Sequence, residues 1–508
     1  MNRAVRRLSI ACLALFVLLL AWVNYLQVFR VNSLANEPGN IRVFDQQLKN
    51  QRGEILASGG GQQKVIAESK LTNGGIYQRY YPDPFTYAPV TGYDSILGTT
   101  SPFGLTGIEQ AENKYLAGTA PGLAVDNLRG LFSGKSKQGA SVYLTIDPKV
   151  QAAAYNALVA MGDSDGGKPA ALVAIDPSTG QILALVSYPT FNPNEFATLS
   201  SAQLQKIDNA YLKNPDQPLL NRALNDTFPP GSTFKIITSS TAYGTGKVTS
   251  PTSTIPAPQF YTPPGTSHAL TNDGDAPCGD GNPQIILAFT LSCNTAFGKL
   301  GVTVGGAPLH KYAELYGFNA GLKGGGPALT IPLPVSPSVY PLEDDPAYRA
   351  LSAIGQLNDA VTPMQEAMMA ATVANHGLLM RPYLVQEIRA PDQQVVENTS
   401  ATAIRQVIPS SVAADLSTMM VSVTHNPAGT AYFTANPSVT DGISIAGKTG
   451  TAQNGVNNSN LDDAVFTCFA PSSDPQIAIG VIVKGGGFGA DAAAPIAVKV
   501  IEAYLGKQ

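Results

Sequence analysis

The sequence predicts a mixed α/β (α+β) fold in which one sheet is formed by two distant parts of the chain. Two apolar stretches, AALVAI and ILALVS, flank the turn sequence DPSTG at 176–180, a pattern typical of a β-hairpin. Three more β-like stretches, GISIAGKTGTA, AVFTCFAP and QIAIGVIVKGGG, precede a final helix-like APIAVKVIEAYLG. Helical patterns dominate between these two regions, up to about residue 427. We therefore expect early and late strands to join in one sheet, with helices between them.

The N-terminus predicts a membrane anchor. Arg3, Arg6 and Arg7 precede the segment 8–29, which has no charged residue. An apolar run near 20 residues can cross the roughly 30 Å hydrocarbon core as a helix, and flanking arginines favour the cytoplasmic side. The alternative is a cleaved signal peptide, but its apolar region is shorter and ends at a small-residue site. We expect a cytoplasmic tail at 1–7, an uncleaved transmembrane anchor at 8–29, and the remaining chain outside the membrane.

Residues 30–139 predict a small module of short strands and loops without a dense core of its own. GEILASGGGQQ reads as a strand that ends in a glycine-rich turn, and GGIYQRYY alternates like a strand. GLTGIEQAENKYLAG has a short helical pattern that ends at glycine. At SVYLTIDPKVQAAA the sequence pattern changes to that of a strand, a turn and an amphipathic helix. We interpret 30–139 as a non-catalytic pedestal and 140–508 as the main domain.

Composition excludes some functions. The net charge is −4 and charged residues make up 13%, so nothing indicates nucleic-acid binding. The four cysteines are Cys12, Cys278, Cys293 and Cys468, with no Cys-x-x-Cys pair, and the histidines are scattered. We therefore expect no metal site. Cys278 and Cys293 are the closest pair outside the membrane, and the sequence leaves open whether they form a disulfide or remain free thiols.

One stretch imitates a nucleotide-binding loop. Gly442, Gly447, Lys448 and Thr449 fit the spacing G-x-x-x-x-G-K-T. A phosphate cradle needs a flexible loop that leads into a helix, because the backbone N–H groups of both must point at the phosphate. Here the four middle residues have a strand pattern and no helical pattern follows. The sequence therefore argues against nucleotide binding.

The stretch FPPGSTFKIITSS suggests a nucleophile. Ser232 follows a glycine and begins a helix-like run, where serine is ordinarily an N-cap. Lys235 lies three residues later, on the same helix face. The run around it is apolar, which predicts a buried lysine with a lowered pKa. A neutral amine beside a serine hydroxyl at a helix N-terminus can activate that hydroxyl for attack.

Two further polar stretches could complete a site. LSCNTAF places Ser292 and Asn294 two residues apart after a helical run, where one could relay a proton and the other could hold a substrate amide. The late strand carries Lys448, Thr449, Gly450 and Thr451, whose side chains alternate between its two faces. An exposed edge there can pair with an extended peptide, and a glycine allows close approach. Taken alone, each stretch is better interpreted as an ordinary helix end or strand end.

Together and in this order, Ser-x-x-Lys, Ser-x-Asn and Lys-Thr-Gly resemble the active-site motifs of penicillin-binding proteins and serine β-lactamases. The similarity extends to VYLTIDPKVQAAA, NRALNDTFPPGSTFK and AIGQLNDAVTPMQEAMMAATVANHG, and covers about 141–508. The short N-terminal module resembles monofunctional, class B members, most closely the actinobacterial penicillin-binding protein A type. The resemblance implies the serine β-lactamase and penicillin-binding transpeptidase fold, with a central antiparallel sheet and a helical subdomain.

The resemblance also implies roles for these residues. Ser232 would attack a peptidoglycan stem peptide that ends in D-Ala-D-Ala, with Lys235 as its base and Ser292 as the donor to the leaving amine. Asn294, Lys448, Thr449, Gly450 and Thr451 would bind the peptide, and the backbone N–H groups of Ser232 and Thr451 would form the oxyanion hole. The acyl group would pass to an amine of a neighbouring stem, with no metal or cofactor.

The partners that the resemblance implies are stem peptides or their lipid-linked precursor, β-lactams, the cytoplasmic membrane and a SEDS-family glycan polymerase. The catalytic domain would lie outside the cell membrane on a single-pass anchor. A D,D-carboxypeptidase, a β-lactamase and a β-lactam-binding scaffold or sensor are the alternatives. Cys468 departs from the family pattern, because many relatives carry a small residue on the strand beside Lys448.

Overall fold

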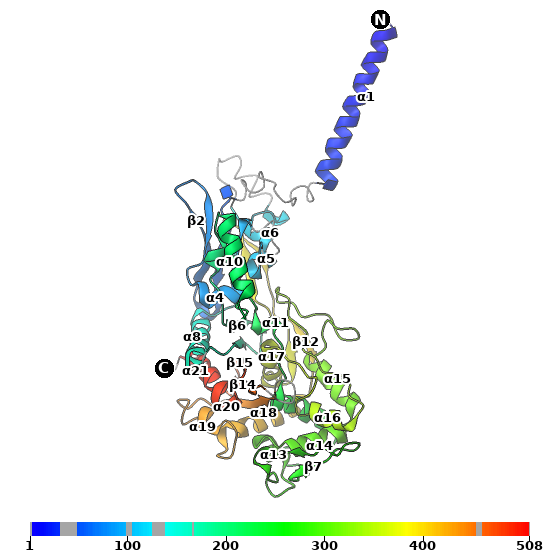
Figure 1. Cartoon of the computed structure of the whole chain (residues 1–508), viewed down its shortest axis with the longest axis vertical. Coiled ribbons are helices and arrows are strands. Elements are labelled where there is room, and N and C mark those ends of the chain that lie inside the picture. Colours follow the sequence, from blue (N-terminus) through cyan, green and yellow to red (C-terminus); the bar gives the residue numbers. More distant parts are fainter. Residues whose placement is uncertain are drawn as a thin grey trace.

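The computed structural model describes residues 3–30, 48–97, 104–123, 138–164, 167–453 and 460–506. Figure 1 shows a long N-terminal helix that projects from a body with two regions. The region nearest this helix contains β2, α4, α5, α6 and α10, and helices α13 to α16 lie at the opposite end.

The central sheet has five antiparallel strands and joins the two distant parts of the chain, as the sequence predicts. Its order is β13-β14-β15-β5-β6, and each neighbouring pair is antiparallel. Every residue of β14 and β15 is buried, because helices cover both faces of the sheet. This explains why these strands read as continuous apolar runs rather than alternating ones. The strands are β5 (Ala170–Ile175), β6 (Ile182–Tyr188), β13 (Ala446–Ala452), β14 (Asp463–Ala470) and β15 (Ile477–Val483).

Three helices cover this sheet and fix the site's position. α17 (Pro363–Ala374) is buried along its whole length and packs on β15, β14 and β5. α8 (Pro148–Ser164) and α21 (Ala494–Leu505) pack against each other and against the sheet. Thr362 caps α17, since its hydroxyl accepts a hydrogen bond from the Gln365 N–H at 3.1 Å.

Short helices and four small strands make up most of the remaining domain. The strands between residues 378 and 406 interrupt a region for which the sequence predicted mainly helices. The helices are α9 (Pro193–Phe196), α10 (Ser201–Lys213), α11 (Arg222–Asn225), α12 (Lys235–Gly244), α13 (Ile285–Thr290), α14 (Asn294–Val304), α15 (Gly306–Tyr316), α16 (Pro346–Ser352), α18 (Ser410–His425), α19 (Tyr432–Ala435) and α20 (Gly489–Ala492). The small strands are β7 (Phe260–Tyr261), β8 (Leu270–Thr271), β9 (Leu378–Met380) and β12 (Ala403–Gln406).

A second, six-stranded sheet spans the two regions in the order β11-β10-β4-β1-β2-β3. Three of its strands precede residue 140 and three follow it, and β1 pairs with β4 in parallel. Most buried apolar residues described in the N-terminal region belong to the same cluster as the main domain, and Ala88 and Tyr93 join a second cluster with Phe191, Phe196 and Leu204. Both clusters therefore contain residues from the two regions. The elements involved are β1 (Ile55–Ala57), β2 (Lys64–Leu71), β3 (Tyr77–Tyr80), α4 (Pro84–Thr91), α5 (Gly107–Ala111), α6 (Asn113–Leu116), β4 (Ser141–Leu144), β10 (Val385–Arg389) and β11 (Val395–Asn398).

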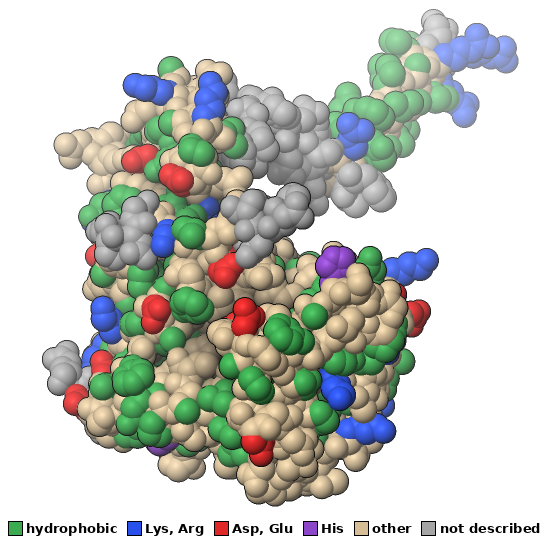
Figure 2. All heavy atoms as spheres, turned by 60° about the horizontal axis from the view of Figure 1, so that its bottom comes forward, with side chains coloured by type: hydrophobic (Ala, Val, Ile, Leu, Met, Phe, Trp, Pro, Cys, Tyr) green, Lys and Arg blue, Asp and Glu red, His purple; other side chains and the backbone are tan. Residues whose placement is uncertain are grey.

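The N-terminal helix has the length and composition that a membrane span needs. α1 (Arg3–Tyr25) contains the segment Val5–Tyr25, whose mean hydropathy is 2.2 and whose side chains are unburied. A short π-helix, Leu26–Arg30, continues it. Figure 2 shows hydrophobic side chains around this helix and basic ones at its far end. An exposed apolar helix of this kind is consistent with a bilayer anchor.

The structure also gives the pairing of the cysteines and the conformation of the stretch 442–449, which has the spacing of a nucleotide-binding loop. Cys278 and Cys293 form a disulfide, while Cys12 and Cys468 are free. The expected strand at 443–446 is only partly present, because β13 begins at Ala446 and the three residues before it lie outside any strand. Gly447 and Lys448 are then buried strand residues paired with β14. A paired strand offers no free loop of N–H groups for a phosphate.

Candidate active site

Ser232 lies in a tight 3₁₀ turn, Gly231–Phe234, that leads directly into α12. Gly231 has φ of +56°, and its N–H donates to the Gly355 carbonyl oxygen at 2.9 Å. A Cβ at this position would lie 2.8 Å from the Thr451 carbonyl oxygen, so only glycine fits. The turn therefore presses against the end of β13 and leaves Ser232 partly exposed.

Lys235 is fully buried beneath Ser232, as the sequence predicts. Its Nζ lies 2.9 Å from Ser232 Oγ, 2.7 Å from the Ser292 carbonyl oxygen and 2.8 Å from Asn294 Oδ1, all within hydrogen-bond distance. Burial and the nearby charge of Lys448 hold the pKa of Lys235 well below its usual value. Both effects favour the neutral amine, which lies in contact with the serine hydroxyl.

Ser292 lies in the turn between α13 and α14, and Asn294 is the first residue of α14. Ser292 has a left-handed backbone with φ of +59°, which is unusual for a residue with a side chain. This conformation directs both its hydroxyl and its carbonyl oxygen at Lys235, at 3.1 Å and 2.7 Å. The disulfide of Cys293, the residue between them, ties the turn to Cys278.

Lys448 is fully buried on β13 and contacts the same serine. Its Nζ donates to Ser292 Oγ at 3.0 Å and to the Thr449 carbonyl oxygen at 2.9 Å. Burial lowers its pKa to about 7, while the carboxylate of Asp273 favours the charged form. Ser292 Oγ thus lies between two lysines and connects the three motifs.

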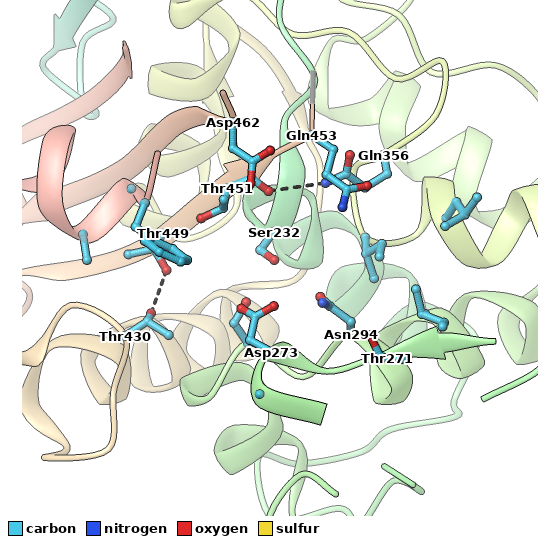
Figure 3. Close-up of a pocket in the computed structure, with 18 of the residues that line it drawn as sticks. Ser232, Thr271, Asp273, Asn294, Gln356, Thr430, Thr449, Thr451, Gln453 and Asp462 are labelled. Atoms are coloured by element: carbon cyan, nitrogen blue, oxygen red, sulfur yellow. Dashed lines mark hydrogen bonds between the residues drawn. The ribbon is translucent and has the colours of Figure 1, made fainter. Parts of the chain in front are cut away.

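The free edge of β13 borders the site. β13 is an outer strand of its sheet, with β14 on one side. The Thr451 carbonyl oxygen accepts a hydrogen bond from Gln356 Nε2 at 3.3 Å, so the backbone of Thr451 faces away from β14. The hydroxyl oxygens of Thr449 and Thr430 lie 2.6 Å apart. In Figure 3, Ser232 lies near the centre, with Thr449 and Thr430 to its left and Asp273 and Asn294 below it.

Gly450 also has a role in packing. A Cβ there would lie 2.8 Å from the Pro230 carbonyl oxygen and 2.9 Å from the Val465 Cβ. The glycine therefore seats the nucleophile's turn on β13.

A cavity of about 810 Å³ opens at Ser232 (Figure 3). Of the predicted site residues, it is lined by Ser232, Ser292, Asn294, Thr449 and Thr451, while Lys235, Lys448 and Gly450 lie behind them. Sequence reasoning missed several polar or aromatic lining residues, because they come from loops without a recognisable motif. These are Thr271, Asp273, Gln356, Thr430, Gln453, Asp462, Phe488 and Asp491.

Comparison with known protein families matches both regions of the chain. Residues 170–502 match the penicillin binding protein transpeptidase domain, and residues 52–142 match the penicillin binding protein A dimerisation domain. The peptidoglycan D,D-transpeptidase PbpA of Mycolicibacterium smegmatis is 39% identical, over 99% of each chain. The protein of the same name from Mycobacterium tuberculosis is 37% identical, again over 99% of each chain.

Solved structures agree with these relatives. The imipenem acyl-enzyme complex of penicillin-binding protein A from M. tuberculosis is 37% identical, with a TM-score of 0.82 over 91% of this chain and 100% of that one. The penicillin G acyl-enzyme complex of that protein has a TM-score of 0.80 over 90% of this chain and 100% of the other. With its motifs assembled around one serine, this chain belongs to the penicillin-binding protein family, with the transpeptidase domain and the dimerisation domain of penicillin-binding protein A.

Proposed function

We propose that this chain is a peptidoglycan D,D-transpeptidase that cross-links stem peptides through an acyl-enzyme on Ser232. One observation carries the proposal. The buried amine of Lys235 contacts the Ser232 hydroxyl at 2.9 Å and also holds Ser292 and Asn294. The homologues are named as D,D-transpeptidases, and the similar structures hold β-lactams as acyl-enzymes.

Lys235 acts as the base for Ser232. A neutral amine has two hydrogens to donate and one lone pair. The carbonyl oxygens of Ser292 and Asn294 can only accept, so they take the two hydrogens. The lone pair is then left for the proton of the Ser232 hydroxyl as the oxygen attacks the substrate carbonyl.

The backbone N–H groups of Ser232 and Thr451 stabilise the oxyanion that forms. The outward-facing backbone of Thr451 lies against the turn that carries Ser232, which supports this assignment. One such donor contributes about 2.7–4 kcal/mol in comparable acyl-transfer sites. Because both groups are main-chain amides on packed elements, little reorganisation accompanies the reaction.

Ser292 passes the proton to the leaving D-alanine amine. Its Oγ lies 3.1 Å from Lys235 Nζ and 3.0 Å from Lys448 Nζ, so it can exchange protons with either amine. Lys448 keeps the site positive, and the hydroxyls of Thr449 and Thr451 bind the terminal carboxylate. Asn294 uses Oδ1 to accept from Lys235, which leaves its NH₂ group for a peptide carbonyl.

The surroundings of the reaction follow from the anchor. We assign a cytoplasmic tail at 1–7, a transmembrane anchor at 8–29, a pedestal at 30–139 and the transpeptidase domain at 140–508. Arginines before the apolar helix favour an extracytoplasmic catalytic domain. There it meets the stem peptides of nascent or lipid-linked peptidoglycan, and the anchor and pedestal provide contact with a SEDS-family glycan polymerase.

The direct test is cross-linking of defined lipid-linked substrate by the detergent-solubilised full chain. We expect cross-linked dimers and released D-alanine, and no product from Ser232→Ala. A fluorescent penicillin should label the parent chain covalently and leave Ser232→Ala unlabelled. Labelling of Ser232→Ala would overturn the assignment of the nucleophile. Release of D-alanine without cross-links, when an acceptor stem is present, would indicate a D,D-carboxypeptidase instead.

A further inference from the structure

Glu366 is a buried acid directly behind the nucleophile's turn. It lies on α17, and its side chain is fully inaccessible to solvent. Its Oε1 lies 2.7 Å from the Thr233 hydroxyl, whereas Oε2 has no hydrogen-bond partner within the described part of the chain. When one oxygen of a buried carboxyl group has no hydrogen-bond partner, ionisation of that group costs much free energy.

The hydrogen count at Thr233 defines the protonation state of Glu366. Thr233 Oγ1 lies 2.8 Å from the Pro230 carbonyl oxygen and 2.7 Å from Glu366 Oε1. A hydroxyl has one hydrogen, and the Pro230 carbonyl can only accept. Two full hydrogen bonds, neither sharing its hydrogen, form at once when Glu366 donates to Thr233 and Thr233 donates to Pro230. Burial also raises the pKa of Glu366 to about 8.

The rest of Glu366 is fixed to the central sheet. Its carbonyl oxygen accepts a hydrogen bond from the Thr467 hydroxyl of β14 at 2.7 Å. Gly480 of β15 lets α17 approach closely, since a Cβ there would lie 2.5 Å from the Ala367 nitrogen. The carboxyl group is therefore held at a fixed height above the sheet.

The other end of this series of hydrogen bonds, at Pro230, packs against β13. A Cβ at Gly450 would lie 2.8 Å from the Pro230 carbonyl oxygen and 3.2 Å from Thr233 Cγ2. Pro230 and Thr233 are thus the residues through which the turn of Ser232 packs against the Lys-Thr-Gly strand. A shift at either would move Ser232 relative to Thr451.

We propose that Glu366 is a positioning residue for acylation. As a neutral carboxylic acid it donates to Thr233, which donates to the Pro230 carbonyl and holds the turn of Ser232 against β13. The result is a fixed distance between the Ser232 nucleophile and the two oxyanion N–H groups. This inference rests on the proposed function, in which Ser232 is the nucleophile.

The experiment compares penicillin acylation in variants of the full chain. Glu366→Gln keeps a neutral donor to Thr233, and we expect an acylation rate constant within threefold of the parent. Glu366→Leu removes the donor, and we expect a loss of at least tenfold. Thr233→Val interrupts the same series of hydrogen bonds at its middle, and we expect an equal loss in the acylation rate constant. Combining Glu366→Leu with Thr233→Val should reduce the rate constant little further, because both substitutions act through the same hydrogen bonds.

A matched control separates positioning from general damage to α17. Thr372 is a fully buried residue of the same helix, and within the described part of the chain its hydroxyl bonds only the Met368 carbonyl of that helix. Thr372→Val removes a buried hydroxyl without touching the turn of Ser232, so acylation should stay within twofold of the parent. Rates are normalised to the fraction of chains that saturating penicillin labels, so a fraction that fails to fold does not enter them.

The outcomes discriminate two failures. If the parent chain takes no penicillin, the proposed function fails. If the parent is labelled and Glu366→Leu acylates at the parental rate, the positioning role is wrong. If Glu366→Gln loses as much as Glu366→Leu, an ionised carboxylate is needed and the neutral-acid assignment is wrong.

Discussion

Asp273 is the acid in the cavity whose charge acts on both active-site lysines. Its carboxylate favours the protonated forms of Lys448 and Lys235. Burial has already lowered the pKa of Lys448 to about 7. The pH range in which Lys448 is charged therefore ends near neutrality and depends on Asp273.

We expect Asp273→Asn to move the alkaline limb of acylation to lower pH. Protonated Lys448 attracts the carboxylate of a penicillin, so acylation falls as pH rises through the pKa of Lys448. Without the carboxylate of Asp273 that pKa falls further, and the decline begins at lower pH. The measurement is the second-order acylation rate constant as a function of pH. Asp491→Asn, a cavity residue that does not act on Lys448, serves as the control; an unmoved limb in Asp273→Asn would contradict the prediction.

At the scale of single residues, the motif residues could be predicted from the sequence, but the residues and backbone conformations that position them could not. Ser232 and Lys235 could be found because spacing alone puts them on one helix face. Glu366 could not, because a single acid in PMQEAMMAAT is typical of a helix with one exposed face, and α17 has none. The left-handed backbone of Ser292 has no sequence signal either, since a turn between helices accepts many residues.

At the scale of the element, Glu366 makes the stability of α17 depend on pH. The unfolded carboxyl titrates near 4.5 and the folded one near 8. Between these values the unfolded chain binds fewer protons than the folded chain, so stability falls by up to about 1.4 kcal/mol for each unit of pH increase. Glu366→Gln should therefore melt higher than the parent at pH near 8, with a difference that shrinks toward pH near 5. Thermal unfolding measured across this range is the test, and a constant difference would contradict it.

The disulfide is the second element-scale contribution. Cys278 and Cys293 are 15 residues apart, and closing a loop of that length stabilises a fold by about 3 kcal/mol in the chain-entropy model. We expect the double variant Cys278→Ser, Cys293→Ser to unfold at a lower temperature than the parent. A reducing agent should lower the melting temperature of the parent and leave the double variant unchanged. Equal sensitivity of both proteins to the reducing agent would argue against this bond.

The elements of the central sheet could be predicted because their apolar runs are long and their turns are clear, as in DPSTG. The small strands β9 to β12 could not, since short half-exposed strands have little periodicity.

At the scale of the whole molecule, the wall of the catalytic cavity carries negative charge, while Lys448 behind it is positive when protonated. Among the described residues that line it, the charged ones are Asp273, Asp462 and Asp491. The two lysines lie behind the wall, and a concave surface concentrates the field of its charges. A cationic ligand should therefore enter more readily than an anionic one.

We expect a penicillin with an ammonium side chain to acylate severalfold faster than a penicillin with a carboxylate side chain. The comparison is made at low salt, with an uncharged side chain as reference, and the difference should shrink as salt is added. The double variant Asp462→Asn, Asp491→Asn should reduce it, because it removes two of the three charges. If neither salt nor these substitutions changes the difference in acylation rate, the shape of the penicillin side chain, and not its charge, determines the order of the rates.

The joining of early and late strands was predictable at this scale, but the partner of β4 was not. Pairing between strands far apart in sequence leaves no local pattern, and SVYL looks the same in either sheet. The structure places β4 between β1 and β10, with strands from both sides of residue 140.

This shared sheet limits how the gene can be divided. A catalytic domain produced alone from residue 140 would keep β4 and β10 but lose β1, β2 and β3. The freed side of β4 would expose unpaired N–H and C=O groups, and such an edge recruits other chains. Recombination that exchanges the pedestal must therefore also supply a strand that pairs in parallel with β4. The two regions therefore share one sheet, even though the family comparison divides them in two.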